Sequence, residues 1–250
     1  MASSGRPHRR RAMRANRAMQ VGMHQASHGV EGRGWVALLI VGTVALLAFF
    51  QIGQDVLVHE SSAFDNAIRS WVLAHQTPGP FAFFLWGTRV GSTRSMYAIS
   101  VVASAYLWYR DEWRVAASVL IAPALAIAAY ETVKRLYGRA RPPGFSQISD
   151  GSFSFPSAHA TAATAVCCSL AYVLWREGVL GRVAMLAFGM IVPVLVGVSR
   201  VYLDAHWATD VLGGWSAGLF IAMVSAGVYS RARLRANTHA AASSGPRTTR

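Results

Sequence analysis

The amino-acid sequence consists of long apolar runs separated by short polar segments. A run of roughly 20 apolar residues is long enough for a helix to cross a membrane, and no strand-like alternation competes with this pattern. The pattern therefore predicts an all-α integral membrane protein whose spans pack as a six-helix bundle. The six predicted spans lie at residues 34–53, within 81–109, and at about 115–133, 158–175, 183–198 and 207–229.

The second span is the hardest to bound, because Arg89 and Arg94 interrupt residues 81–109. We expect the crossing itself to begin near Ser95, with the preceding residues packed at the membrane interface. Before it, apolar residues recur at helical spacing within the mixed stretch 54–80, which predicts a short helix lying on the interface. These residues are Phe64, Ile68, Trp71 and Val72.

Two basic segments without long apolar runs flank the spans. Residues 1–33 contain seven Arg and one acidic residue, and residues 231–250 are basic and rich in Ser, Ala and Thr. Neither segment can bury a core, so both are predicted to be disordered tails, with residues 34–230 forming the membrane domain. An Arg-rich start also resembles an organellar transit peptide, but the apolar run that follows directly favours a cytoplasmic tail and a retained first helix.

Composition narrows the function classes. Of the 250 residues, 53% are hydrophobic and 14% are charged, and the net charge is +13. A basic chain often binds nucleic acid, but apolar residues arranged in long runs argue against that partner. The adjacent Cys167 and Cys168 can form neither a disulfide framework nor a metal cluster.

The distribution of charge predicts the orientation of the chain. Because positive residues favour the cytoplasmic side, the basic ends place both termini in the cytoplasm of a multi-pass protein of the plasma (inner) membrane. The segments 54–80, 134–157 and 200–206 then lie outside. Segment 134–157 breaks the rule, since Lys134, the only Lys, and three Arg lie on the side that should be depleted of positive charge. Positive charge kept there favours an anionic ligand.

Three polar blocks, each at the outer end of a predicted span, carry the candidate chemistry: residues 134–142, 156–159 and 199–210. His206 and Asp210 are four residues apart, so a helix would place them on one face. There the carboxylate can hold one ring nitrogen and leave the other free to attack, and Arg200 offers a planar fork of donors for a phosphate. Each block alone has a structural explanation: snorkelling basic side chains, a Pro-Ser helix start, or a helix-capping Asp. Together they favour one phosphate site.

The blocks resemble the signature of the type 2 phosphatidic acid phosphatase superfamily, KxxxxxxRP, PSGH and SRxxxxxHxxxD. Here the three blocks begin at Lys134, Pro156 and Ser199 and keep every spacing. The one departure is Ala158, where the pattern has Gly; Ala keeps its backbone N–H and is strained only at a positive φ. The resemblance covers residues 115–229 strongly, and it implies an active site at the extracytoplasmic membrane boundary.

The resemblance implies a role for each residue of the blocks. His206 attacks the phosphorus and forms a phosphohistidine that Asp210 stabilises, while His159 protonates the leaving oxygen. Cationic side chains neutralise the phosphate oxygens, and a hydroxyl and the backbone at a helix start donate hydrogen bonds to them. No metal or other cofactor is required. The substrate-binding residues implied in this way are Lys134, Arg141, Ser157, Ala158 and Arg200.

Other polar residues near the blocks receive weaker assignments. Arg135 and Arg139 are expected to contact lipid headgroups rather than a second phosphate. Asp204 is expected either to cap the sixth span or to touch the substrate. The remaining aromatic and histidine residues are expected to be interfacial anchors or exposed bystanders: Tyr202 and Trp207 in the first role, His59 and His75 in the second.

The position of the site predicts a lipid phosphate as the partner, because a headgroup can reach the cations while its tail stays in the bilayer. Undecaprenyl diphosphate is the favoured substrate, and phosphatidic acid and phosphatidylglycerol phosphate are alternatives; family analogy, not a residue, makes this choice. A lipid phosphotransferase on the same fold is a second hypothesis. A non-catalytic lipid-binding protein is disfavoured, because every catalytic position is filled. The sequence leaves the oligomeric state open.

Overall fold

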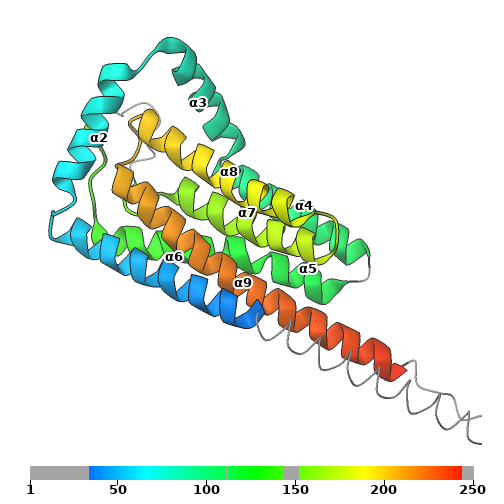
Figure 1. The fold of residues 1–250 in the computed structure, drawn as a ribbon. Coiled ribbons are helices and arrows are strands. Elements are labelled where there is room, and N and C mark those ends of the chain that lie inside the picture. The colour runs from blue at the N-terminus through cyan, green and yellow to red at the C-terminus, as the bar shows by residue number, and fades with distance from the viewer. Residues whose placement is uncertain (1–33, 111, 144–151, 244–250) are drawn as a thin grey trace, which may run out of the picture. The chain divides into compact units, whose positions relative to one another are not determined.

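The computed structural model describes residues 34–110, 112–143 and 152–243, with side chains described through residue 238. All regular elements in this part of the chain are α-helices (Figure 1), which confirms the predicted all-α class. Residues 41–250 form one compact unit, and the helix contacts given below are those of this unit.

Apart from the segment 138–157, the helices follow one another with short connections. The first spans Gly34–Leu57, and α2 (Ser62–His75) confirms the short helix predicted in the polar stretch after it. The remaining helices are α3 (Pro78–Val90), α4 (Thr93–Tyr109), α5 (Trp113–Val119), α6 (Ile121–Tyr137), α7 (Ala158–Arg176), α8 (Arg182–Tyr202) and α9 (Ala208–Ser243).

Helix α7 is the centre of the bundle. It packs against α4, α6, α8 and α9, and alanines such as Ala160 and Ala163 are fully buried along it. Small residues allow neighbouring helices to approach closely. On α9, a Cβ added at Gly218 would lie 2.6 Å from the backbone oxygen of Thr161. The N-terminal ends of α7 and α9, which carry two of the three polar blocks, therefore lie side by side.

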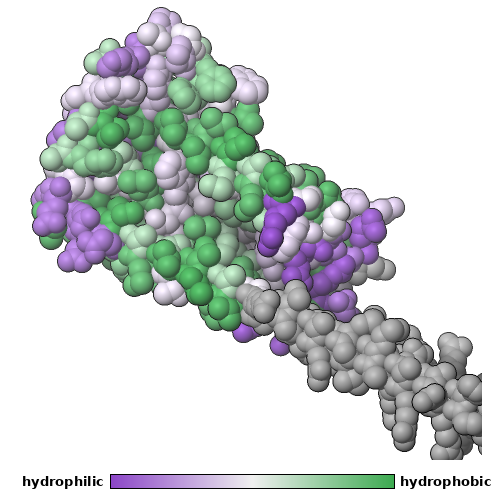
Figure 2. Space-filling model, viewed as in Figure 1, coloured by the Kyte–Doolittle hydropathy of each residue, from purple (hydrophilic) through white to green (hydrophobic). Residues whose placement is uncertain are grey.

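Apolar side chains cover much of the outer surface. Figure 2 shows them as a broad green area over the visible face, with hydrophilic residues gathered towards its edges. On α8, exposed side chains include Leu186, Met190 and Leu195. Among the described residues, five helical segments are long and apolar enough to cross a membrane: Gly34–Leu57, Trp113–Tyr137, Ala158–Arg176, Arg182–Tyr202 and Ala208–Thr238. The remaining predicted crossing, the second along the chain, corresponds to α4, which has 17 residues.

Three predicted boundaries differ from the structure. Helix α6 continues past the predicted end at residue 133 to Tyr137, so Lys134 lies on a helix rather than in the predicted outer loop. The span predicted at 115–133 is divided into α5 and α6 at Leu120, because Pro123 has no N–H to donate to the carbonyl four residues earlier. Helix α8 continues past the predicted end at residue 198 to Tyr202. Arg200 therefore lies in the last turn of a helix, where the sequence predicted an external loop.

The predicted C-terminal tail is also partly wrong, because α9 runs on to Ser243. Ala, Leu and Arg in this segment favour a helix. Arg233 holds it against the bundle by ion pairs with Glu112 at 3.0 Å and Glu177 at 2.7 Å. The other predicted tail residues, 1–33 and 244–250, lie outside the described residues.

Candidate active site

The three polar blocks meet at one cavity of about 160 Å³, at the end of the bundle where α7 and α9 begin. Six of the eight predicted site residues line it, and three further residues that were not predicted complete the lining. The predicted six are Lys134, Arg141, Ala158, His159, Arg200 and His206, and the others are Thr93, Tyr130 and Glu131.

His206 and Asp210 form the pair that their spacing predicted. The Nδ1 atom of His206 lies 3.3 Å from Oδ2 of Asp210. A carboxylate accepts a hydrogen bond from an N–H group, so this contact favours the tautomer with hydrogen on Nδ1. The other ring nitrogen, Nε2, carries the lone pair and lies 3.1 Å from Nη1 of Arg141, beside the cavity.

Burial keeps the His206 ring neutral. The pKa of His206 is lowered to about 4, mainly by removal from water and also by the charges of Arg141 and Arg200. The contact with Asp210 opposes this shift. At neutral pH the imidazole is therefore uncharged, which is the state in which Nε2 can attack an electrophile.

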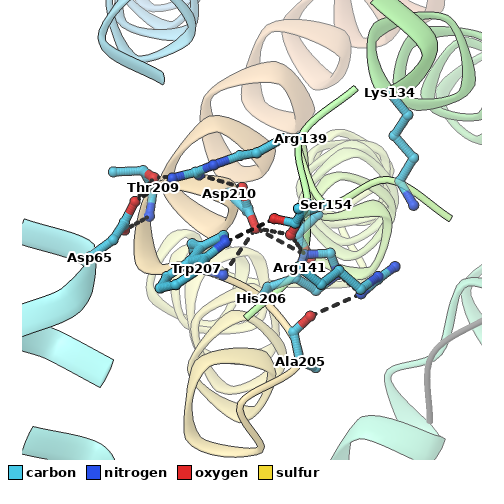
Figure 3. Close-up of polar contacts among 12 residues, drawn as sticks. Asp65, Lys134, Arg139, Arg141, Ser154, Ala205, His206, Trp207, Thr209 and Asp210 are labelled. Atoms are coloured by element: carbon cyan, nitrogen blue, oxygen red, sulfur yellow. Dashed lines mark hydrogen bonds and ion pairs between the residues drawn. The ribbon is translucent and has the colours of Figure 1, made fainter. Parts of the chain in front are cut away.

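Asp210 is held from several sides (Figure 3). Its Oδ2 atom accepts hydrogen bonds from the backbone N–H of Trp207 at 2.9 Å and from the hydroxyl of Ser154. The Trp207 bond is that of a capping box, in which an acidic side chain in the first turn reaches back to the residue before the helix. The start of α9 thus fixes the carboxylate locally, and the backbone oxygen of Asp210 accepts the N–H of Ser157 at 3.0 Å, which joins the second and third blocks.

Three buried or half-buried cations face the cavity. Neutral oxygen atoms orient them: Lys134 Nζ donates to Ser152 Oγ at 2.9 Å, and Arg200 Nη1 donates to Thr88 Oγ1 at 3.0 Å. Arg141 donates through Nε to the Ser152 carbonyl at 2.9 Å. Three positive charges around so small a volume create a potential that favours an anion.

The start of α7 offers neutral donors to the same anion. Ser157 occupies the N-cap position without making a side-chain cap, and its Oγ is buried with no hydrogen-bond partner among the described residues. Ala158 opens the helix, whose first N–H groups have no carbonyl partner within it. The described non-glycine residues with positive φ are His59 and Asp204, so Ala158 is not strained at the position of the pattern's Gly.

Two assignments made from the sequence are wrong. Arg139 was expected to contact lipid headgroups, but its guanidinium is half-buried and lies 2.6 Å from both Asp65 Oδ2 and Asp210 Oδ1. Asp204 was expected to cap the sixth span or touch the substrate, but it pairs with Arg69 at 2.7 Å. Both residues therefore hold α2 against the loop and helix that carry His206 and Asp210.

The structure adds residues that no sequence motif marks. Asp65 is the most consequential, and one signal was available: it lies seven residues before Val72, on the face of α2 that both residues bury. Ser152 and Ser154 lie within the predicted outer loop without any motif to mark them. The aromatic anchors make specific contacts: Tyr202 packs on Phe84, and Trp207 Nε1 donates to the Ala140 carbonyl at 3.0 Å.

The fold and the site together define a multi-helix membrane protein with a cationic, histidine-containing anion pocket. Residues 112–234 match the model of the PAP2 superfamily, so this part of the chain belongs to that superfamily and the predicted resemblance is confirmed. The match contains all three polar blocks.

Comparison with individual proteins extends the similarity beyond the motifs. The chain is 29% identical over 183 residues to phosphatidylglycerophosphatase B of Bacillus subtilis, covering 71% of this chain and 90% of that protein. It is 28% identical over 137 residues to an undecaprenyl-diphosphatase of Sulfolobus acidocaldarius, covering 52% and 62%. The fold is similar to the crystal structure of a transmembrane PAP2-type phosphatidylglycerolphosphate phosphatase from Bacillus subtilis, with a TM-score of 0.69, 26% identity and coverage of 76% and 96%.

Proposed function

We propose that the chain is a membrane lipid phosphatase that removes the terminal phosphate of a lipid phosphate or diphosphate through a phosphohistidine on His206. The observation that carries this proposal is the orientation of His206. Its Nδ1 faces Asp210 at 3.3 Å, and its Nε2 lies beside Arg141 at 3.1 Å, at the edge of the cationic cavity. A neutral, carboxylate-held imidazole next to an anion pocket is the arrangement that nucleophilic phosphoryl transfer requires.

In the first step, Nε2 of His206 attacks the terminal phosphorus and the bond from phosphorus to the leaving oxygen breaks. His159 gives a proton to that oxygen. The ring of His206 becomes positively charged, and Asp210 balances this charge. Lys134, Arg141 and Arg200 neutralise the oxygens of the transferring group, where the transition-state charge resides.

In the second step, water replaces the lipid alcohol. His159, which lost its proton in the first step, accepts a proton from the water as the water oxygen bonds to phosphorus. The nitrogen–phosphorus bond breaks, inorganic phosphate leaves, and His206 returns to its neutral state. A phosphotransferase would use a lipid hydroxyl in place of this water.

The substrate proposed from the sequence is undecaprenyl diphosphate, with phosphatidylglycerol phosphate and phosphatidic acid as alternatives. The two kinds of relative support different members of this group, because the Bacillus protein is named for phosphatidylglycerophosphate and the Sulfolobus protein for undecaprenyl diphosphate. The longer alignment is with the Bacillus protein, which favours testing phosphatidylglycerol phosphate beside the diphosphate.

The proposed topology has six spans, cytoplasmic termini and an extracytoplasmic site. Helix α4 would supply the second of these six spans: its 17 residues correspond to a length of about 26 Å, close to the roughly 30 Å of a hydrocarbon core. Exposed apolar residues along α4, such as Ile99 and Val102, support contact with lipid. A reporter fused after Ser149 tests the orientation, and a cytoplasmic signal would contradict it.

The central experiment measures phosphate release by the purified chain in detergent from each of the three lipids, with EDTA present. We expect release by wild type and a loss of at least ~10³-fold for His206→Ala and His159→Ala, the scale for a nucleophile or its acid–base partner. His75→Ala is the matched control, because this histidine is exposed at the end of α2.

A second measurement separates the competing functions. Radiolabelled lipid phosphate should label wild type with an acid-labile phosphate and leave His206→Ala unlabelled. Label that passes to an added lipid alcohol identifies a phosphotransferase. Lipid binding without release, or activity retained by His206→Ala, would refute the proposed mechanism.

A further inference from the structure

Asp65 lies outside the three polar blocks, on α2, yet its carboxylate is buried beside them. Only 2% of the residue is exposed. Its Oδ1 accepts the backbone N–H of Thr209 at 2.9 Å, and its Oδ2 accepts the hydroxyl of the same residue at 2.6 Å. A charged side chain buried this deeply requires specific partners, and the partners here belong to the first turn of α9.

The first of these contacts replaces a missing helix cap. Helix α9 begins at Ala208, and the residue before it is Trp207, whose indole cannot accept a hydrogen bond. A helix start normally relies on such a side chain to satisfy a free N–H in the first turn. Asp65 supplies the acceptor from another helix, so α2 fixes the end of α9 that carries Asp210.

Asp65 is also linked to Asp210 itself, through the guanidinium of Arg139. Its Nη2 donates to Asp65 Oδ2 and its Nη1 donates to Asp210 Oδ1, both at 2.6 Å (Figure 3). The guanidinium is a rigid planar fork, so holding one arm defines the direction of the other. Because Arg139 takes Oδ1 of Asp210, the remaining oxygen, Oδ2, is the one that faces Nδ1 of His206.

Charge gives Asp65 a further effect. Arg139 beside Asp210 alone would be a neutral pair, with little negative charge left to balance a positive imidazole. Asp65 shares the same guanidinium, so the three side chains carry a net charge of −1. That charge is the one needed when His206 becomes positive on phosphorylation.

We infer that Asp65 and Arg139 are positioning residues that act on His206 through Asp210, and that they couple the interfacial helix α2 to the nucleophile. This inference rests on the proposed function of His206. Neither residue is among those that line the cavity, and Arg139 binds no lipid headgroup in this role. Removing Asp65 is expected to slow phosphoryl transfer without weakening substrate binding.

The chain offers a matched control on the same helix. Arg69 of α2 pairs with Asp204, with Nε to Oδ1 at 2.7 Å and Nη2 to Oδ2 at 2.8 Å. This pair also ties α2 to the segment before α9, but the contacts of Asp204 do not include Asp210. Asp204→Asn therefore tests whether any loss follows merely from loosening α2.

The kinetic experiment compares Asp65→Asn in two backgrounds. With Asp210 present, we expect Asp65→Asn to lower kcat roughly 10-fold to 100-fold with KM nearly unchanged, the scale of a lost outer partner of a functional histidine. In the Asp210→Asn background the same change should lower kcat less than about twofold, because the residue through which Asp65 acts is gone. Asp204→Asn alone should lower kcat no more than about fivefold. Equal losses in both backgrounds, or an equal loss for Asp204→Asn, would overturn the inference.

A measurement without substrate keeps this test separate from the proposed function. The Nδ1–H resonance of His206, assigned by its loss in His206→Gln, should be protected from solvent exchange in wild type and Asp204→Asn. In Asp65→Asn it should broaden or exchange at least tenfold faster. An unchanged resonance would overturn the inference whatever the activity. Absence of phosphate release by wild type, with this resonance behaving as expected, would count against the proposed function alone.

Discussion

Gly218 of α9 packs directly against the backbone of Thr161 on α7: a Cβ at Gly218 would lie 2.6 Å from the Thr161 oxygen. Backbone cannot move aside as the end of a flexible side chain can. The contact sets the spacing of the two helices whose first turns carry His159 and Asp210. It follows that the site depends on a small residue two turns away from it.

We therefore expect Gly218→Ala to lower the free energy of unfolding by about 1–3 kcal/mol, the usual cost of overpacking a tight interface. Melting of the purified chain in detergent measures this. Gly87→Ala is the control, because Gly87 lies within α3 and has no atom near its missing side chain. Equal melting temperatures for the two variants would show that the helices can separate without strain.

The parts of the site that follow local spacing could be predicted from the sequence. His206 and Asp210 are four residues apart, and although α9 begins only at Ala208, the turn that leads into it brings their side chains together. The Ser157–His159 block likewise needed only a helix beginning at residue 158. Apolar run length predicted the five helices that are long and apolar enough to cross a membrane for the same reason, since it depends on neighbouring residues alone.

What could not be predicted depends on residues far apart in the chain. Arg139 contacts Asp65, 74 positions earlier, and Asp210, 71 positions later. Taken alone, an arginine at a membrane boundary is most simply explained as a headgroup contact. The extension of α9 beyond its apolar residues depends in the same way on the ion pairs of Arg233 with residues far away in the chain, which no local pattern reveals.

Arg141 should not tolerate lysine. Its Nε, Nη1 and Nη2 atoms contact Ser152, Ala205 and His206 together, and an ammonium cannot reproduce this planar set. We expect Arg141→Lys to lower kcat/KM for phosphate release by roughly 10²-fold. Arg135→Lys in the same block is the control. The only described ion pair of Arg135 is an exposed contact with Glu131 at 3.5 Å. The kcat/KM of Arg135→Lys should therefore stay within about fivefold of wild type.

The pH dependence of stability should report the buried histidine. Folding lowers the pKa of His206 to about 4, against about 6.5 in an unfolded chain. Between these values the unfolded chain binds a proton that the folded chain does not, so stability falls as pH drops from 6.5 to 4. The melting temperature of wild type should fall more over this range than that of His206→Gln. Parallel curves would mean that His206 is protonated in the folded chain.

Replacing Ala158 with the glycine of the family motif should change the activity little. Ala158 begins α7 without a positive φ, and its N–H remains available. Glycine in a helix costs up to about 1 kcal/mol, so we expect kcat/KM of Ala158→Gly to stay within about fivefold of wild type. A rise of more than tenfold would instead mean that the Ala158 methyl group obstructs the cavity that it lines.

Ser157→Ala should separate activity from stability. The Ser157 hydroxyl is buried and has no hydrogen-bond partner among the described residues, so its removal costs the free protein no contact and relieves an unsatisfied polar group. In the proposed reaction this hydroxyl donates to a phosphate oxygen, and losing such a donor costs roughly 10²-fold in kcat. Ser157→Ala should therefore melt at the wild-type temperature or above while releasing phosphate roughly 10²-fold more slowly.

Thr161→Ala, on the next turn of α7, provides the contrast. The Thr161 hydroxyl donates to the Ser157 carbonyl at 2.9 Å, so this variant should lose stability before activity. A Ser157→Ala variant with wild-type turnover would remove Ser157 from the site.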